Sequence, residues 1–177
     1  NINHAKKAGV TIHEYCPLTN RDPDIEAAFD RVTHEWLGQK KSSLLSFTMG
    51  TVGFDHPMDK RYFYAENAEG KIVAFIAFVP FLGKDGYMAD VTRHGNDAPG
   101  GVMETIIYEA FQTFREEGVH YGSLGVAPLA GLDDEKAGLV EQFLRFIYNH
   151  LNDCYGFKDL YRAKEKYSPT EWLPAYY

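Results

Sequence analysis

Hydrophobic residues recur at helical spacing in three stretches of the chain. The first stretch follows Asp22-Pro23, which places an N-cap residue before a proline at the first helical position, and it ends at Gly38. The second stretch ends at Gly118. The pattern therefore predicts amphipathic helices with apolar positions Ile25, Ala28, Phe29, Val32 and Trp36 in the first, Met103, Ile106, Ile107, Ala110 and Phe114 in the second, and Leu139, Phe143, Phe146, Ile147 and His150 in the third.

Shorter runs that alternate, or that are continuously apolar, predict strands between these helices. Two of them are joined by Asn67-Ala68-Glu69-Gly70, a short hairpin signal. Residues 39–60 contain Gly, Ser, Pro and scattered aromatics, which predict an irregular cover. The predicted strands are residues 10–15, 61–66, 71–80, 87–92 and 119–124, followed by strand-like pieces in the tail at residues 157–177.

This order of elements predicts an α/β fold. Helix, three antiparallel strands, helix, strand, helix and strand follow one another as in the Gcn5-related acetyltransferase architecture, a central mixed sheet with helices on both faces. A length of 177 residues suits one such domain. We expect it to span residues 23–177, after an N-terminal arm of residues 1–22 that contains the first strand.

Composition and charge narrow the class of protein. The net charge of −7 argues against non-specific RNA binding and leaves room only for a local basic patch. Cys16 and Cys154 form neither a disulfide framework nor a metal-ligand spacing, which favours a reducing, cytosolic setting. The longest apolar run, residues 72–83, is about half of the ~20 residues of a membrane-spanning helix, and no signal peptide is visible. The sequence also contains no H-E-x-x-H pattern and no G-x-S-x-G elbow, so neither a metal site nor a hydrolase triad is predicted.

The densest set of candidate residues runs from Asp90 to Glu104, where a strand enters a polar, glycine-rich loop that opens a helix. Helix N-termini attract anions, and in an acetyltransferase this one would hold the pyrophosphate of coenzyme A. The usual Arg/Gln-x-x-Gly-x-Gly/Ala signature is absent, because Asn96 stands where glycine is expected after Arg93. We therefore predict no cofactor. Asn96 or Asp97 can equally act as a plain helix cap.

Asp90 and Arg93 are the central candidates for chemistry. A carboxylate at a strand end can bind a substrate ammonium, and an arginine can hold a phosphate or a carboxylate through two hydrogen bonds. If the strand reaches Arg93, the odd spacing places the two side chains on opposite faces; if the loop begins at Thr92, both can line one cleft. A surface ion pair is the ordinary alternative.

Two further segments offer backbone donors and cations. Residues 122–131 are rich in small residues, so backbone N–H groups near Ser123 and Gly125 can stabilise an oxyanion, although a plain turn is the commoner structure. Residues 158–169 are the most basic stretch of the chain and suit a tRNA phosphate or an anionic lipid headgroup, with a solvated charged strand as the alternative. The candidates in this stretch are Tyr161, Arg162, Lys164 and Lys166.

Together these segments resemble the C-terminal synthase domain of bacterial phosphatidylglycerol lysyltransferases, which are aminoacyl-tRNA-dependent lipid aminoacyltransferases. The resemblance depends on the order and spacing of several short motifs between about residue 62 and residue 177. They are Gly70-Lys71-Ile72-Val73-Ala74-Phe75, Asp90-x-x-Arg93-His94, Asp97-Ala98-Pro99-x-Gly101-Val102-Met103, Leu124-Gly125-x-Ala127-Pro128-Leu129-x-Gly131-Leu132, Lys164-Glu165-Lys166-Tyr167-x-Pro169 and Trp172-x-Pro174-x-Tyr176. Val91, Thr92 and Ala130 depart mildly from the family pattern and leave the donor amino acid open.

The resemblance implies transfer of an aminoacyl group, usually lysyl or alanyl, from aminoacyl-tRNA to a glycerol hydroxyl of phosphatidylglycerol at the cytoplasmic face of the membrane. The product would lower the negative charge of the membrane and its attraction for cationic antimicrobial peptides. It also implies a parent protein with an N-terminal companion domain and a membrane-embedded region, in which residues 1–9 would end an interdomain helix. The implied roles are binding of the donor ammonium by Asp90 and Glu104, anion binding by Arg93 and Lys164, oxyanion donation by the backbone at Ser123 and Gly125, and further substrate contacts by Asp97, Tyr161, Arg162 and Lys166.

Three other functions remain open from the sequence. A coenzyme A-dependent N-acyltransferase would use the same fold, but this sequence lacks the pyrophosphate-binding signature of such enzymes. A non-catalytic fragment would bind tRNA or lipid without turnover. A peptidoglycan aminoacyltransferase would use the amine of a cell-wall precursor as acceptor.

Overall fold

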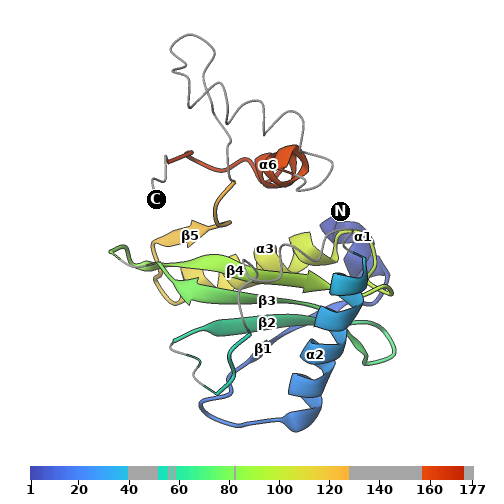
Figure 1. Cartoon of the computed structure of the whole chain (residues 1–177). Helices are drawn as coiled ribbons and strands as arrows, with labels where there is room; N and C mark the ends of the chain where they lie inside the picture. Colours follow the sequence, from blue (N-terminus) through green and yellow to red (C-terminus); the bar gives the residue numbers. More distant parts are fainter. Residues whose placement is uncertain (40–51, 56, 58, 82, 128–156, 174–177) are drawn as a thin grey trace, which may run out of the picture. The chain divides into compact units, whose positions relative to one another are not determined.

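The computed structural model describes residues 1–39, 52–55, 57, 59–81, 83–127 and 157–173 (Figure 1). The chain forms two compact units, Asn1–Leu124 and Gly125–Tyr177. The first unit contains the sheet, and the second contains the C-terminal helix. The earlier boundary between an arm of residues 1–22 and a domain of residues 23–177 stays a prediction.

A five-stranded mixed sheet forms the centre of the first unit. The spatial order is β1-β2-β3-β4-β5, in which the first three pairings are antiparallel and β4 pairs with β5 in parallel. The strands are β1 (Thr11–Tyr15), β2 (Arg61–Glu66), β3 (Ile72–Pro80), β4 (Gly86–His94) and β5 (Tyr121–Ser123). The mixed sheet agrees with the predicted acetyltransferase-like architecture, although β4 runs two residues further than the sequence indicated.

Helices cover both faces of this sheet, as predicted (Figure 1). On one face lies α2 (Pro23–Gly38), whose Phe29 stacks on Phe75 of β3 with ring centroids 4.2 Å apart. On the other lie α3 (Val102–Glu116) and the short α1 (Ile2–Lys7), and there Phe114 packs edge-on against Phe78 at 5.3 Å. Phe75 and Phe78 are three positions apart on β3, and an odd spacing along a strand sends side chains to opposite faces. Two apolar layers result, one on each face.

The start of α2 forms as the sequence predicts. Asp22 has an extended backbone, and its carboxylate accepts hydrogen bonds from the backbone N–H groups of Asp24 at 3.0 Å and Ile25 at 3.3 Å. These two donors have no partner inside the helix, so the cap satisfies them. Pro23 needs no such bond and fixes the backbone at the first helical position.

The hairpin between β2 and β3 has an equally local cause. The side chain of Asn67 accepts hydrogen bonds from the backbone N–H groups of Glu69 at 3.2 Å and Lys71 at 2.9 Å. Gly70 completes the turn with φ +74, a conformation that residues with a Cβ seldom adopt. The hairpin prediction is confirmed.

The tail differs from its prediction. Strand-like pieces were expected from residue 157 onward, but residues Phe157–Glu165 form the helix α6. Leu, Arg, Ala, Lys and Glu in this stretch are all strong helix formers, and a short alternation of aromatic and charged residues does not outweigh them. The predicted helix over residues 139–150 lies outside the described residues.

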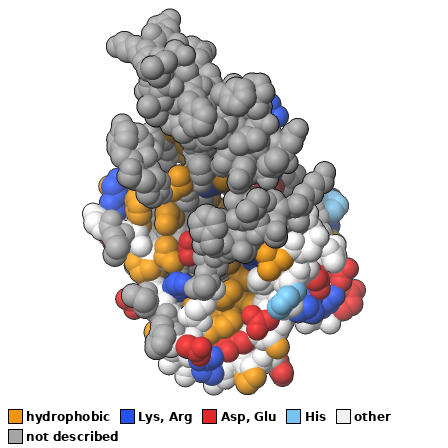
Figure 2. Space-filling model, in the orientation of Figure 1, with side chains coloured by type: hydrophobic (Ala, Val, Ile, Leu, Met, Phe, Trp, Pro, Cys, Tyr) orange, Lys and Arg blue, Asp and Glu red, His pale blue; other side chains and the backbone are white. Residues whose placement is uncertain are grey.

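No helix in the described part of the chain is both long and apolar enough to span a membrane. On the face shown in Figure 2, acidic and basic side chains are interspersed over the described surface.

Candidate functional site

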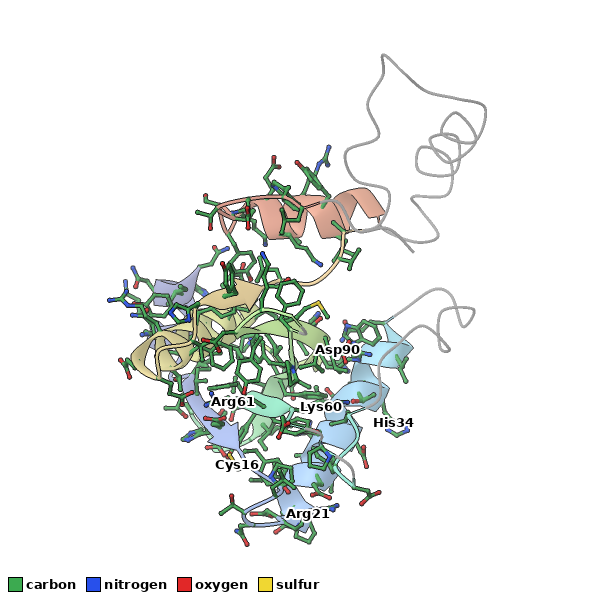
Figure 3. The ribbon with its side chains drawn as sticks, turned by 90° about the vertical axis from the view of Figure 1, so that its left-hand side faces the viewer. Cys16, Arg21, His34, Lys60, Arg61 and Asp90 are labelled. Atoms are coloured by element: carbon green, nitrogen blue, oxygen red, sulfur yellow. The ribbon has the colours of Figure 1, made fainter. Side chains whose placement is uncertain are left out.

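Asp90 lies at a β-bulge in the middle of β4. Ala77 of β3 pairs with Val91, and Phe78 pairs with Ala89, so Asp90 has no direct partner on β3. A bulge inserts one extra residue into a strand and re-aims the side chains beside it, and bulges are frequent next to active sites. Figure 3 shows Asp90 on β4, at a place separate from Arg61 on β2.

The bulge changes the face to which the odd-numbered residues of β4 point. Before it, Tyr87 stacks on Phe114 of α3 with ring centroids 4.8 Å apart. After it, Val91 belongs to the core beneath α2, and Arg93 lies against Trp36 of α2. Because β4 continues to His94, the prediction of a loop from Thr92 is wrong. The alternative prediction placed Asp90 and Arg93 on opposite faces of the sheet. It assumed that side chains alternate without a break along β4, and the bulge interrupts this alternation.

Arg93 is a buried cation with an unused donor. Its side chain is 6 % exposed, and its guanidinium lies 3.9 Å from the centre of the Trp36 ring. Nη1 donates to the carbonyl of Thr92 at 2.9 Å, whereas Nε has no hydrogen-bond partner among the described residues. Burial lowers the pKa of the guanidinium, and the negative charge of Asp90 partly opposes this. A guanidinium with an unpaired N–H group can bind an anion.

The loop after Arg93 is fixed to the end of α2. The carboxylate of Glu35 accepts a hydrogen bond from the backbone N–H of Asn96 at 2.9 Å and another from Arg31 at 3.0 Å. The first of these bonds is the main reason that the pKa of Glu35 lies below its ordinary value. Gly95 donates to the carbonyl of Val73 at 2.8 Å, and a Cβ at Gly95 would collide with Glu35. The path of the chain beyond the strand is therefore tightly held.

The capping role considered for Asn96 and Asp97 is wrong. Helix α3 begins later, with Gly101 as its N-cap at φ +88 and with no side-chain capping bond. Asn96 instead accepts a hydrogen bond from Gln39 at 2.9 Å, and Asp97 forms an ion pair with Lys71 at 2.5 Å. The hydrogen bond from Lys71 lowers the pKa of Asp97. Both side chains thus hold the loop, and a substrate contact of Asp97 stays a prediction.

Glu104 lies in the first turn of α3, beside the start of α1. Its carboxylate accepts a hydrogen bond from the side chain of Asn1 at 2.9 Å. The backbone carbonyl of Asn1 also fills the space that a Cβ at Gly101 would need. The N-terminus of α3 is therefore packed by α1, and the predicted contact of Glu104 with a substrate ammonium stays a prediction.

The parallel pairing of β4 with β5 ends just before the bulge. Ser123 lies opposite Met88, and this is the last described pair. Asp90 follows two residues later on β4, so the carboxylate lies beyond the point where the described strands separate. Gly125 has φ +77, which requires a glycine or strains the backbone. Its role as an oxyanion donor stays a prediction.

The second unit holds the remaining candidates on α6 and just beyond it. The ammonium of Lys164 donates to the backbone carbonyl of Val126 at 2.6 Å, and Tyr161 stacks on Trp172 with ring centroids 4.8 Å apart. Arg162 is exposed and so is Lys166, which follows the helix. These two cations are accessible to an anionic ligand.

Lys164 is expected to titrate well below an ordinary lysine. Burial lowers its pKa to about 8 from an ordinary value of 10.5. NMR of the reductively ¹³C-methylated protein, with Lys164→Arg to assign the signal, measures this directly. We expect one methyl-lysine signal to shift near pH 8 and to disappear in the variant, while the exposed lysines shift at much higher pH. If every lysine titrates together above pH 10, the side chain is not buried as described.

Two residues around the candidate site were not predicted to have a function. Trp36 was assigned only to the apolar stripe of the first helix, and Glu35 was not singled out. Nothing local in the sequence distinguishes them, because their partners Arg93 and Asn96 lie far along the chain. The Asp90-x-x-Arg93 spacing gave no indication that the arginine would be buried against an aromatic ring.

A family model described as "Phosphatidylglycerol lysyltransferase, C-terminal" matches the whole chain, residues 1–177. The chain belongs to this family. The resemblance found in the sequence is thereby confirmed.

Named relatives agree with this assignment. The phosphatidylglycerol lysyltransferase of Bacillus subtilis (strain 168) is 33 % identical over 147 residues, which are 82 % of this chain and 17 % of that protein. The lysylphosphatidylglycerol biosynthesis bifunctional protein LysX of Mycobacterium marinum is 24 % identical over 179 residues, 99 % of this chain and 16 % of that protein. This chain of the phosphatidylglycerol lysyltransferase C-terminal family thus spans about one sixth of the length of these relatives.

A solved structure has the same fold. L-PGS from Bacillus licheniformis matches with a TM-score of 0.72 and 27 % sequence identity, over 96 % of this chain and 50 % of that one. The similarity covers both the sheet unit and most of the rest of the chain. The fold of the described elements is therefore found in a solved structure of a similar protein.

Proposed function

We propose that the protein transfers an aminoacyl group, lysyl or alanyl, from aminoacyl-tRNA to phosphatidylglycerol. The observation that carries the proposal is the match of all 177 residues to the C-terminal part of the phosphatidylglycerol lysyltransferases. The 33 % identity with the enzyme of that name from Bacillus subtilis supports it. Since the chain spans only part of its relatives, the proposal includes a companion domain and a membrane-embedded region in the complete protein, which would act at the cytoplasmic face of the membrane.

The transfer reaction requires the protein to orient two substrates and to stabilise a developing negative charge. A glycerol hydroxyl of the lipid attacks the ester carbonyl, the bond to the tRNA ribose breaks, and the proton of the hydroxyl ends on the ribose oxygen. Because the ester is already activated, the site must align the two substrates and stabilise the tetrahedral oxyanion. The described residues contain suitable groups for both tasks.

Each candidate has a role in this scheme. Asp90, an exposed carboxylate at the bulge, binds the ammonium of the aminoacyl donor. Arg93, whose Nε has no hydrogen-bond partner among the described residues, holds a phosphate or the developing negative charge. In the second unit, Lys164 offers a cation for a phosphate or for developing negative charge. Tyr161, Arg162 and Lys166 contact the tRNA phosphates or the lipid headgroup, and the backbone at Ser123 and Gly125 donates to the oxyanion.

The product would change the electrostatics of the membrane. A lysyl group adds cationic ammonium groups to an anionic lipid, and an alanyl group adds one. A less negative surface attracts cationic peptides less strongly. Resistance to cationic antimicrobial peptides is thus the proposed consequence of the reaction.

The proposal is tested by incubating the full-length protein with a pool of tRNAs charged with labelled amino acids. Vesicles of phosphatidylglycerol and vesicles of phosphatidylcholine are offered in parallel. Label in phosphatidylglycerol alone supports the proposal, and fractionating the tRNA pool identifies the donor. Labelled cell-wall precursor, or acylation from acetyl-coenzyme A in place of lipid transfer, would contradict it.

Replacement of Asp90 by asparagine is expected to reduce kcat/KM about 10²-fold or more, because the amide keeps the shape of the side chain and loses the charge that pairs with the donor ammonium. Stability should change by less than about 0.5 kcal/mol, since the side chain is exposed. The rates of the two proteins with the same charged tRNA, together with their melting temperatures, measure both effects. An Asp90→Asn protein with normal transfer would remove Asp90 from the proposed site.

A further inference from the structure

The indole ring of Trp36 lies against the buried guanidinium of Arg93. The guanidinium lies 3.9 Å from the centre of the indole ring, in a position where it is 6 % exposed. No ion pair of Arg93 with a carboxylate is found in the described residues. The face of the ring therefore provides a favourable electrostatic contact for this buried cation.

Contact with a ring face leaves the N–H groups of a guanidinium available for hydrogen bonds, whereas contact with a carboxylate uses them. The N–H groups of a guanidinium lie in its plane, so a ring above the plane uses none of them. Arg61 shows the contrary case: its N–H groups donate to both Glu14 and Glu117, and its hydrogen-bonding edge is occupied. Among the described residues, Arg93 donates from Nη1 to the carbonyl of Thr92, and its buried Nε has no hydrogen-bond partner.

The last turn of α2 contacts both the Arg93 side chain and the loop that follows Arg93. Trp36 contacts the Arg93 side chain, and the adjacent Glu35 binds the backbone of Asn96, three residues after Arg93. Arg31, one turn earlier, donates to Glu35 at 3.0 Å and to the carbonyl of Ile72 at 2.6 Å, which ties the turn to β3. The position of the ring relative to β4 is therefore fixed by several bonds of the same helix.

We propose that Trp36 is a positioning residue, which holds the buried Arg93 guanidinium against its ring so that the Nε–H, which has no partner among the described residues, can donate to a phosphodiester of a substrate. The inference rests on the proposed function, in which both substrates, the lipid and the tRNA, carry phosphodiesters. A planar fork of N–H donors is the group that best matches two phosphate oxygens. Trp36 acts through Arg93 and does not itself contact the reacting atoms.

A double-mutant cycle tests whether Trp36 acts through Arg93. The full-length protein and its Trp36→Leu, Arg93→Met and doubly substituted forms are compared for kcat and KM, with the lipid and the charged tRNA varied in turn. Trp36→Leu should lower kcat/KM about tenfold. The loss should appear in the same one of the two parameters, kcat or KM, that Arg93→Met changes. The double variant should be no worse than Arg93→Met alone. Trp36→Phe, which keeps an aromatic face, should recover most of the rate. Independent losses that add in the double variant would overturn the proposal.

Tryptophan fluorescence provides a second test that needs no turnover. The 177 residues contain two tryptophans, so in a protein made of these residues Trp172→Phe leaves Trp36 as the only tryptophan. Phosphatidylcholine vesicles with and without phosphatidylglycerol, and uncharged tRNA, are titrated into this protein. The emission of Trp36 should change saturably with phosphatidylglycerol or with tRNA, which identifies the source of the phosphodiester. The same titration of Trp172→Phe/Arg93→Met should give no change.

The two tests separate the failure of this inference from the failure of the proposed function. A fluorescence response that depends on Arg93, in a protein that transfers no aminoacyl group, would support the role of Trp36 and contradict the proposed reaction. Normal transfer with no fluorescence response to either ligand would overturn the role of Trp36 and leave the reaction in place.

Discussion

An Arg93→Met protein is expected to lose transfer activity and to keep its stability. We expect kcat/KM to fall by ~10² to 10³-fold, the usual effect of removing one preorganised donor to developing charge. The melting temperature should stay the same or rise, because Arg93 is a buried cation whose buried Nε has no hydrogen-bond partner among the described residues. Methionine fills a similar volume without a charge to desolvate. Loss of activity with gain of stability is typical of a residue kept for function.

Arg61→Met is the matched control for this prediction. Arg61 is also largely buried, but it donates to Glu14 at 2.6 and 2.8 Å and to Glu117, and it lies over the ring of Phe114. Removing it leaves two carboxylates without their partner, so the free energy of unfolding should fall by about 1–3 kcal/mol. Thermal unfolding of both variants makes the comparison. If Arg93→Met destabilises the protein as much as Arg61→Met does, Arg93 is a structural residue.

Phe29→Ala is expected to cost more stability than any other single truncation discussed here. Phe29 is fully buried, stacks on Phe75 at 4.2 Å, and contacts the rings of Tyr15, Tyr62 and Tyr64. Truncation removes buried apolar surface and opens a cavity beneath α2, for a loss of about 3–5 kcal/mol. Urea unfolding followed by circular dichroism, extrapolated to zero denaturant, measures this loss.

Leu37→Ala on the same helix serves as the control for Phe29→Ala. Its side chain is among the exposed large hydrophobic ones, so truncation should change stability by less than about 0.5 kcal/mol. A loss below about 1 kcal/mol for Phe29→Ala would mean that the aromatic layer under α2 is not packed as described.

The elements with local causes were predictable from the sequence. Asp22-Pro23 specifies the start of α2 because the capping bonds reach only two and three residues ahead. The turn at Asn67 likewise depends on bonds within four residues. The bounds of β2 were also predicted correctly, since its run of aromatics is uninterrupted. In these places the chain within a few residues determines the structure.

The geometry of the candidate site depends on distant parts of the chain and could not be predicted. The bulge at Asp90 exists only in the pairing of β4 with β3, and the ring over Arg93 comes from α2. The burial of Lys164 involves the carbonyl of Val126, far earlier in the sequence. The sequence identified Asp90 and Arg93 as candidates near the end of a predicted strand and Lys164 as a candidate in the most basic stretch, whereas their surroundings follow from tertiary packing.

The most direct test of the account is the lipid composition of cells that produce the full-length protein. A bacterial host whose own membranes contain phosphatidylglycerol but no aminoacylated form is suitable, and mass spectrometry of its extracted lipids is the measurement. We predict lysyl- or alanyl-phosphatidylglycerol in cells with the natural protein, and its absence in cells with equal amounts of Asp90→Asn or Arg93→Met. The account would be contradicted if the natural protein, correctly folded and inserted, produced no such lipid, or if both variants produced as much of it.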